Sequence, residues 1–143
     1  MVCTFFGHKD APDSMKNELK SAINHLVNLY GVRMFYVGNN GSFDSLVQRT
    51  LIEIQKECPA VSFYVVLSYL GEHAVSAEQE KTILPEGQEL ALPRYAISKR
   101  NGWLINKSNF VIAYVRNRYS NSWKWLEKSR KRGLTVINLA EIS

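Results

Sequence analysis

The chain has 143 residues, of which 45% are hydrophobic and 22% charged, and its formal net charge is +5 at pH 7. This length is typical of one domain with a full core, which needs neither disulfides nor metals for stability. No apolar run approaches the ~18 residues of a membrane span, and the N-terminal residues lack the basic leader and cleavage site of a signal peptide. We therefore expect a cytoplasmic protein with no membrane partner.

The two cysteines, Cys3 and Cys58, have no metal-ligand spacing. We expect both to be free thiols in a reducing compartment, and we expect neither a metal nor another cofactor.

Strand and helix patterns alternate along the chain. Apolar and aromatic runs predict five strands, at residues 2–6, 34–37, 61–67, 110–115 and 135–139. Apolar residues spaced three and four apart predict helices at 19–30, from the 38–44 loop to Pro59, from Pro93 onward and around 123–130. Strands that alternate with helices imply right-handed crossovers and a parallel sheet with helices on both faces. One domain should span residues 1–143, with a long polar loop at about 71–92 that is either a lid or an assembly contact.

The second predicted strand runs straight into a segment rich in glycine and asparagine, residues 38–44. Glycine permits a sharp turn and the close approach of another group, and free N–H groups at the start of the next helix suit an anion such as phosphate. The segment therefore predicts a ligand-binding loop with Asp44 at its mouth. The alternative is an ordinary strand-to-helix turn with an Asx cap.

Polar or small residues follow several predicted strands at the same edge of the sheet, which is where ligands bind in an open parallel sheet. There, Phe43 and Tyr69 are expected to flank a base, and Ser120 and Ser122 to offer hydroxyls to an anion. His8 is expected to bind a phosphate or act as an acid or base, although an ordinary loop histidine is an equal alternative. The candidate ligand-binding residues are Gly7, His8, Lys9, Gly38, Asn39, Asn40, Gly41, Phe43, Asp44, Tyr69, Arg94, Arg100, Asn101, Ser120 and Ser122.

The third predicted helix carries an arginine beside its sheet-packing face. Ala96, Ile97 and Leu104 define that face, and Arg100 shares their spacing. A buried guanidinium without partners is very costly, so Arg100 must meet a carboxylate, backbone carbonyls or a bound anion. An ion pair with Asp44 and a role in holding ligand phosphate or ribose are both open.

Basic residues crowd the last predicted helix and its end. Lys124, Lys128, Arg130, Lys131 and Arg132 form either a solvated helix face or a nucleic-acid footprint. The three tryptophans are expected to be packing residues.

Four ordered motifs resemble those of the small SLOG proteins, the YpsA-like relatives of the LOG phosphoribohydrolases and of DNA-processing protein A. They are Thr-Phe-Phe-Gly-His-Lys at 4–9, Val-Gly-Asn-Asn-Gly-Ser-Phe-Asp at 37–44, Pro-Arg-Tyr-Ala-Ile-Ser-Lys-Arg-Asn-Gly-Trp-Leu-Ile at 93–105, and Lys-Arg-Gly-Leu-Thr-Val-Ile-Asn-Leu at 131–139. The resemblance implies a Rossmann-like three-layer sandwich with a mainly parallel five-stranded sheet that binds nucleotides or nucleotide-derived ligands. It also implies a homo-oligomer of bacterial or phage origin, located in the host cytoplasm in the phage case.

The chain departs from the enzymes of this group after the fourth predicted strand. LOG enzymes cleave the bond between base and ribose phosphate with an arginine, which Arg100 matches, and a glutamate in a glycine-rich loop. Residues 114–122 hold neither that glutamate nor a glycine-rich loop. The departure favours a binding module for a nucleotide-derived ligand, such as a signalling nucleotide, acting as a sensor or sequestering protein.

Two alternatives stay open. The first is an N-glycosidase with Asp44 and Arg100 as catalytic residues, because Asp44 is the only well-placed carboxylate left. The weaker one is nucleic-acid binding through the basic last helix.

Overall fold

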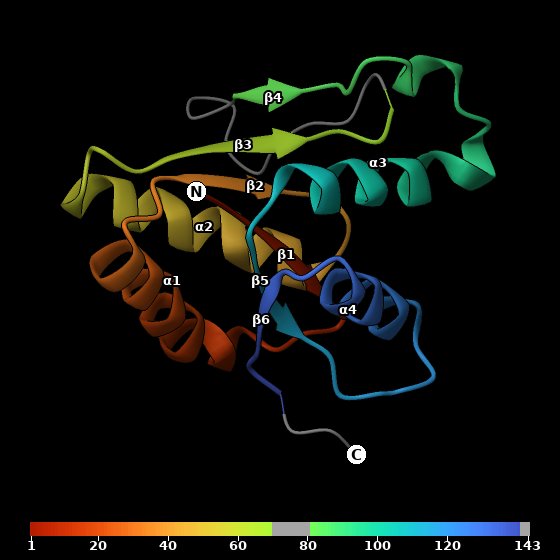
Figure 1. Cartoon of the computed structure of the whole chain (residues 1–143). Helices are drawn as coiled ribbons and strands as arrows, with labels where there is room; N and C mark the ends of the chain where they lie inside the picture. Colours follow the sequence, from red (N-terminus) through yellow and green to blue (C-terminus); the bar gives the residue numbers. More distant parts are fainter. Residues whose placement is uncertain (70–80, 141–143) are drawn as a thin grey trace.

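A computed structural model describes residues 1–69 and 81–140, which form a six-stranded sheet whose hydrogen-bonded strand pairs are all parallel (Figure 1). The strands are β1 (Val2–Gly7), β2 (Met34–Val37), β3 (Ser62–Val66), β4 (Thr82–Ile83), β5 (Phe110–Tyr114) and β6 (Thr135–Asn138). Their order across the sheet is β4-β3-β2-β1-β5-β6. Strands β1 to β4 therefore follow one another outward from the centre of the sheet, and β5 lies on the other side of β1. The strand order reverses between these two central strands, β1 and β5.

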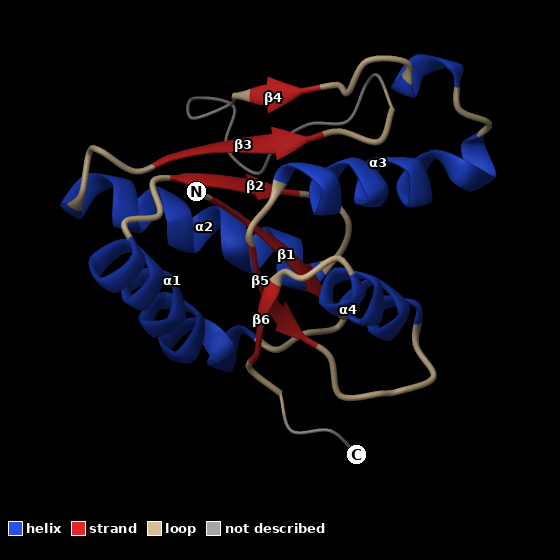
Figure 2. Cartoon of the chain, viewed as in Figure 1, coloured by secondary structure: helices blue, strands red, loops and turns tan. Residues whose placement is uncertain are grey.

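In the described part of the chain, four α-helices cover the sheet in two layers (Figure 2). They are α1 (Lys16–Tyr30), α2 (Ser42–Glu57), α3 (Pro93–Lys107) and α4 (Asn121–Lys131). Their ends follow local rules: Gly31 takes a left-handed φ of 68° after α1, and Pro93 occupies the first turn of α3. Among the described residues, no helix is long and apolar enough to cross a membrane.

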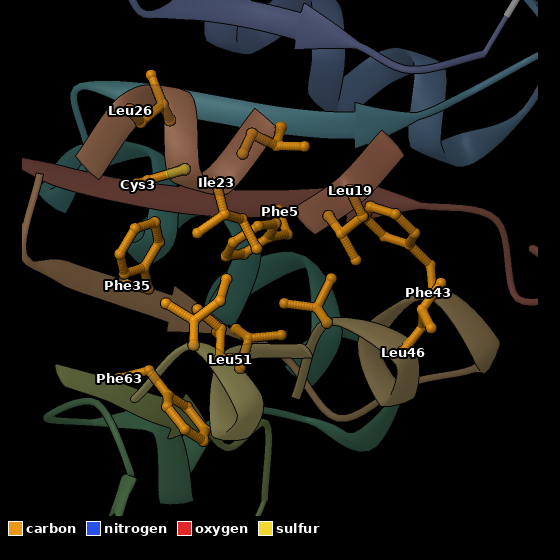
Figure 3. Packing of buried hydrophobic residues seen from close by; sticks show 14 of the residues in the cluster. Cys3, Phe5, Leu19, Ile23, Leu26, Phe35, Phe43, Leu46, Leu51 and Phe63 are labelled. Carbon is orange, nitrogen blue, oxygen red and sulfur yellow. The ribbon is translucent and has the colours of Figure 1, made fainter. Parts of the chain in front are cut away.

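Alternate residues of the central strands pack into two separate cores. Cys3, Phe5 and Phe35 face α1 and α2, whereas Phe6 and Val111 face α3 and α4. Figure 3 shows the first core, in which strand phenylalanines meet leucines of both helices. Because these side chains fix β1 and β2 against α1 and α2, they also fix the loops that follow the two strands.

The predicted α/β sandwich with helices on both faces is confirmed, with one strand more than the five expected. The added strand, β4, lies inside the segment predicted as a loop at 71–92, and it pairs with the edge of β3. Its two residues are too few to carry a periodic pattern. A short 3₁₀ helix, η3 (Gln88–Leu90), follows it. Residues 71–80 of that predicted loop lie outside the described residues.

The predicted face of α3 needs one correction. Ala96 and Leu104 are buried, but Ile97 is 42% exposed. Arg100, one turn from Ala96, is only 2% exposed, as its spacing predicted.

Candidate ligand-binding site

A pocket of about 490 Å³ lies between the carboxyl ends of β1 and β2 and the helices α3 and α4. It adjoins the point where the strand order reverses, which is the usual ligand site of this architecture. Gly7 and Gly38 form its strand side. Arg94, Arg100 and Asn101 come from α3, and α4 contributes its first two turns.

Positive charge dominates the lining of this pocket. The cationic side chains are those of Lys9, Arg94, Arg100, Lys124 and Lys128. Among the described lining residues, Asp44 is the one acidic residue. Five cations around one small cavity repel one another, and an anionic ligand would relieve that repulsion.

The glycine–asparagine loop, residues 38–44, is held by side chains of α2 and by the loop after β1. The Asp44 carboxylate accepts the Asn40 N–H at 2.9 Å, and the Gln48 amide donates to the Gly38 carbonyl at 3.1 Å. The Ser42 N–H, at the start of α2, donates to the Lys9 carbonyl at 2.8 Å. This donor is therefore used within the protein, and the neighbouring loop occupies part of the anion site expected at the start of α2.

Two glycines of this loop are required by close packing. Gly41 has a φ of 91°, and a Cβ there would lie 2.7 Å from the Lys9 Cα. A Cβ on Gly38 would lie 2.8 Å from the Asp44 Oδ2 and 2.9 Å from the Arg100 Nη1. The side chains of Asp44 and Arg100 therefore both pack against the Cα of Gly38. A larger residue at this position would push these two side chains apart.

Arg100 connects three parts of the fold. Its Nε donates to the Asn101 Oδ1 at 2.9 Å, its Nη1 to the Val66 carbonyl at 2.9 Å, and its Nη2 to the Asn40 Oδ1 at 2.7 Å. These bonds tie α3 to the end of β3 and to the glycine–asparagine loop. One of the three acceptors is a backbone carbonyl, a partner type expected from the sequence. The other two are side-chain amides, which the sequence did not predict.

His8 links the loop after β1 to the loop after β5. Its Nε2 accepts the backbone N–H of Arg116 at 2.8 Å, and its ring meets the edge of Tyr114. Burial lowers the pKa of His8, the nearby Asp10 raises it and Arg116 lowers it, so the net shift is downward. His8 lies outside the lining of the pocket.

The structure brings most, but not all, of the predicted residues to this pocket. Those that line it are Gly7, Lys9, Gly38, Asn40, Asp44, Arg94, Arg100, Asn101 and Ser122. Those outside the lining are His8, Asn39, Gly41, Phe43, Tyr69 and Ser120.

Two of the outlying residues, Phe43 and Ser120, make contacts elsewhere, and a third, Tyr69, is exposed. Phe43 is fully buried and stacks on Tyr114 in the core, so the prediction that it flanks a base is wrong. Tyr69 is 56% exposed. The Ser120 hydroxyl caps α4 by accepting the Trp123 N–H at 3.2 Å and also donates to the Asn117 carbonyl.

Apart from Ser122, the α4 wall of the pocket was not predicted. Asn121, Lys124, Trp125 and Lys128 all line it. Their spacings of three and four place them on one face of the helix, a signal that the sequence does contain. The sequence does not show that this face turns toward α3.

No cluster of three or more histidine, cysteine or acidic side chains suited to a metal occurs in the described part of the chain. Both cysteines are free, and burial raises the pKa of the Cys3 thiol.

The sheet order and the position of the pocket define an α/β protein of the Rossmann-like class. No protein-family model and no curated protein matches the chain. Among solved structures it is similar to the crystal structure of DNA processing protein A from Streptococcus pneumoniae, with a TM-score of 0.67 and 14% sequence identity. The similarity covers 94% of this chain and 48% of that protein, so this chain spans about half its length. At this identity the likeness concerns the fold.

Proposed function

We propose that the protein binds a nucleotide or a nucleotide-derived small molecule in the basic pocket beside β1. The observation that carries this proposal is the set of five cationic side chains against one carboxylate, in a cavity of about 490 Å³ at the switch point of the sheet. Cavities of roughly 300–1,000 Å³ accommodate cofactor-sized ligands. Arginine and lysine are the usual partners of phosphate. A binding role and membership of the SLOG superfamily both agree with the motifs of the sequence.

Different parts of the pocket lining suit different parts of a nucleotide. Asn121 and Ser122 lie in the first turn of α4, where the helix dipole favours an anion. Lys124 lies one turn further along the same face. We therefore assign the phosphate to this end of the pocket. The apolar side chains of Phe6 and Leu104 suit the sugar or base.

Titration calorimetry with the four common ribonucleoside 5′-monophosphates tests this proposal. We expect at least one to bind to the wild type, and the Lys124→Ala/Lys128→Ala variant to bind it at least ten-fold more weakly. Arg130→Ala is the matched control, because Arg130 lies on α4 outside the pocket lining and pairs with Glu127. Nucleotide binding that is equally strong in the double variant would contradict the assignment of the pocket.

The same incubation separates binding from hydrolysis. Asp44 is the carboxylate that lines the pocket, so an N-glycosidase would depend on it. Release of free base, detected by chromatography and lost in Asp44→Asn, would establish the enzyme. Recovery of intact nucleotide supports the binding module.

Nucleic-acid binding is a second candidate, favoured by the exposed basic residues of α4 and by the structural similarity to a DNA-processing protein. It predicts that a long single strand binds far more tightly than a mononucleotide and that this affinity falls steeply with salt. Self-association, expected from the sequence resemblance, stays a prediction that light scattering at micromolar concentration tests.

A further inference from the structure

A second cavity, a groove of about 610 Å³ between α3 and α4, opens beside the pocket. The two cavities share Ser98 on α3 and Trp125 and Lys128 on α4. Because they share these side chains, the groove lies directly beside the pocket along the two helices.

The wall between the two cavities is held by aromatic packing. The Trp125 ring stacks on Phe6, with ring centroids 6.2 Å apart. The Lys128 Nζ lies 4.3 Å from the centroid of the Trp125 ring, a cation–π contact. These contacts fix the Lys128 ammonium at the junction, where it can face an anion that belongs to both cavities.

The groove is also positively charged. Beyond Lys128 it is lined by Lys99, Lys131 and Arg132, and its described lining includes no carboxylate. Its remaining surface includes Tyr95, Gly102 and Ile105, which suit an uncharged ring or sugar better than a solvated ion. A ligand whose one phosphate lies in the pocket would place no anionic group near the cations at the far end of the groove.

From the adjacency of the two cavities and the charge of both we propose that the ligand consists of at least two nucleotide units joined by a phosphodiester. The first unit occupies the pocket, the linking phosphate lies at Lys128 and Ser98, and the second unit extends along the groove toward Lys131 and Arg132. This inference rests on the proposed function and specifies the class of ligand.

Calorimetry with adenosine 5′-monophosphate and the 5′-phosphorylated diadenylate pApA, and with the corresponding pairs for the other three bases, tests the inference. We expect the dinucleotide of the preferred base to bind at least ten-fold more tightly than its mononucleotide. Lys131→Ala/Arg132→Ala should remove most of this gain while leaving mononucleotide affinity within two-fold. Arg130→Ala removes the same type of charge next to Lys131 but outside both cavities, so it should change neither affinity.

The outcomes distinguish the two proposals. A mononucleotide that binds as tightly as its dinucleotide overturns the two-unit ligand and leaves the proposed function intact. If neither the mononucleotide nor the dinucleotide of any of the four bases binds, both proposals are wrong. A ten-nucleotide single strand is the third probe. If it binds tightly while the dinucleotide binds no better than the mononucleotide, the groove attracts polyanions generally and the two-unit site is wrong.

Discussion

At the residue scale, a structural role of Arg100 is difficult to separate from its proposed role in ligand binding. Its guanidinium is 2% exposed, lines the pocket, and donates to Val66, Asn40 and Asn101. Substitution would leave buried acceptors on two neighbouring segments without their charged donor. Loss of binding in an Arg100 variant would therefore not by itself locate the ligand, which is why the binding tests use lysines of α4.

We expect Arg100→Ala to lower the free energy of unfolding by about 2–4 kcal/mol, because it removes a buried charged donor and creates unsatisfied acceptors. Urea denaturation followed by circular dichroism measures this loss. Arg94→Ala is the control, because Arg94 is exposed on the same helix, and it should change the free energy by no more than about 0.5 kcal/mol. An Arg100→Ala protein as stable as the wild type would show that the guanidinium is not a structural tie.

Gly7 is required by a side chain, not by its backbone conformation. A Cβ at this position would lie 2.9 Å from the Phe43 Cβ and would overlap the Phe43 ring. That ring cannot move aside, since Phe43 is fully buried. We expect Gly7→Ala to destabilise the protein by about 1–3 kcal/mol, a typical cost of overpacking.

A double-mutant cycle with Phe43→Leu tests the cause of this loss. In the Phe43→Leu background, which removes the ring, Gly7→Ala should cost at least about 1 kcal/mol less than in the wild type. Additive effects in urea denaturation would show that the cost of Gly7→Ala arises elsewhere.

The burial of Arg100 could be predicted from sequence, whereas the burial of Phe43 could not. Arg100 shares the helical spacing of Ala96 and Leu104, so the period of the helix alone determines which side of α3 it occupies. Phe43 is in the first turn of α2, where loop conformation decides which way a side chain points. The sequence places Phe43 near the edge of the sheet but does not show that it fills the space above Gly7.

At the scale of elements, His8 connects the loops that follow the two central strands. Its Nε2 accepts the Arg116 N–H, so only the neutral ring can make this bond. The folded state lowers the pKa of His8, so between the folded and unfolded pKa values the unfolded chain binds more protons. The free energy of unfolding should therefore decrease as the pH falls below about 6.5, the ordinary histidine value.

Urea denaturation at pH 8 and pH 5 measures this effect. His8→Gln does not titrate, so its stability should change less between these two pH values than that of the wild type. The pKa of Glu53 is also lowered, by its hydrogen bond with Lys16, but that contribution is lost at more acidic pH and largely spares this interval. An unchanged pH dependence in His8→Gln would assign the titration to other groups.

The limits of sequence interpretation are also visible in whole elements. The periodicity of α4 predicts a helix and a basic face, but the direction of that face depends on the neighbour against which Leu126 packs. Lys124 and Lys128 consequently looked like solvated or nucleic-acid-binding residues, and only the placement of α4 beside α3 turns them toward the pocket. Strand β4 was missed because its pairing with β3, not its own composition, makes it a strand.

At the scale of the whole molecule, the charge distribution allows the proposed ligand binding to be tested separately from stability. The formal net charge is +5, and five cationic side chains face one cavity. Hydrophobic packing on the two faces of the sheet holds these charges together despite their repulsion. Removing one exposed cation should therefore cost little stability in the absence of ligand, in contrast to the removal of Arg100.

We expect Lys124→Ala to unfold at the same temperature as the wild type or slightly above it when no nucleotide is present. A nucleotide at 100 times its dissociation constant adds about 2.7 kcal/mol to the wild type, which corresponds to roughly 10 °C. If the variant binds ten-fold more weakly, the same concentration adds about 1.4 kcal/mol, so about half of the shift should remain. Thermal unfolding followed by circular dichroism, with and without the nucleotide that binds most tightly, measures both quantities.

A variant that unfolds several degrees lower without ligand would make Lys124 a structural residue, and a variant with the full ligand-induced shift would place the nucleotide elsewhere. Since Lys124 lies on the pocket wall and Arg130 on the same helix outside it, Arg130→Ala should retain the whole shift.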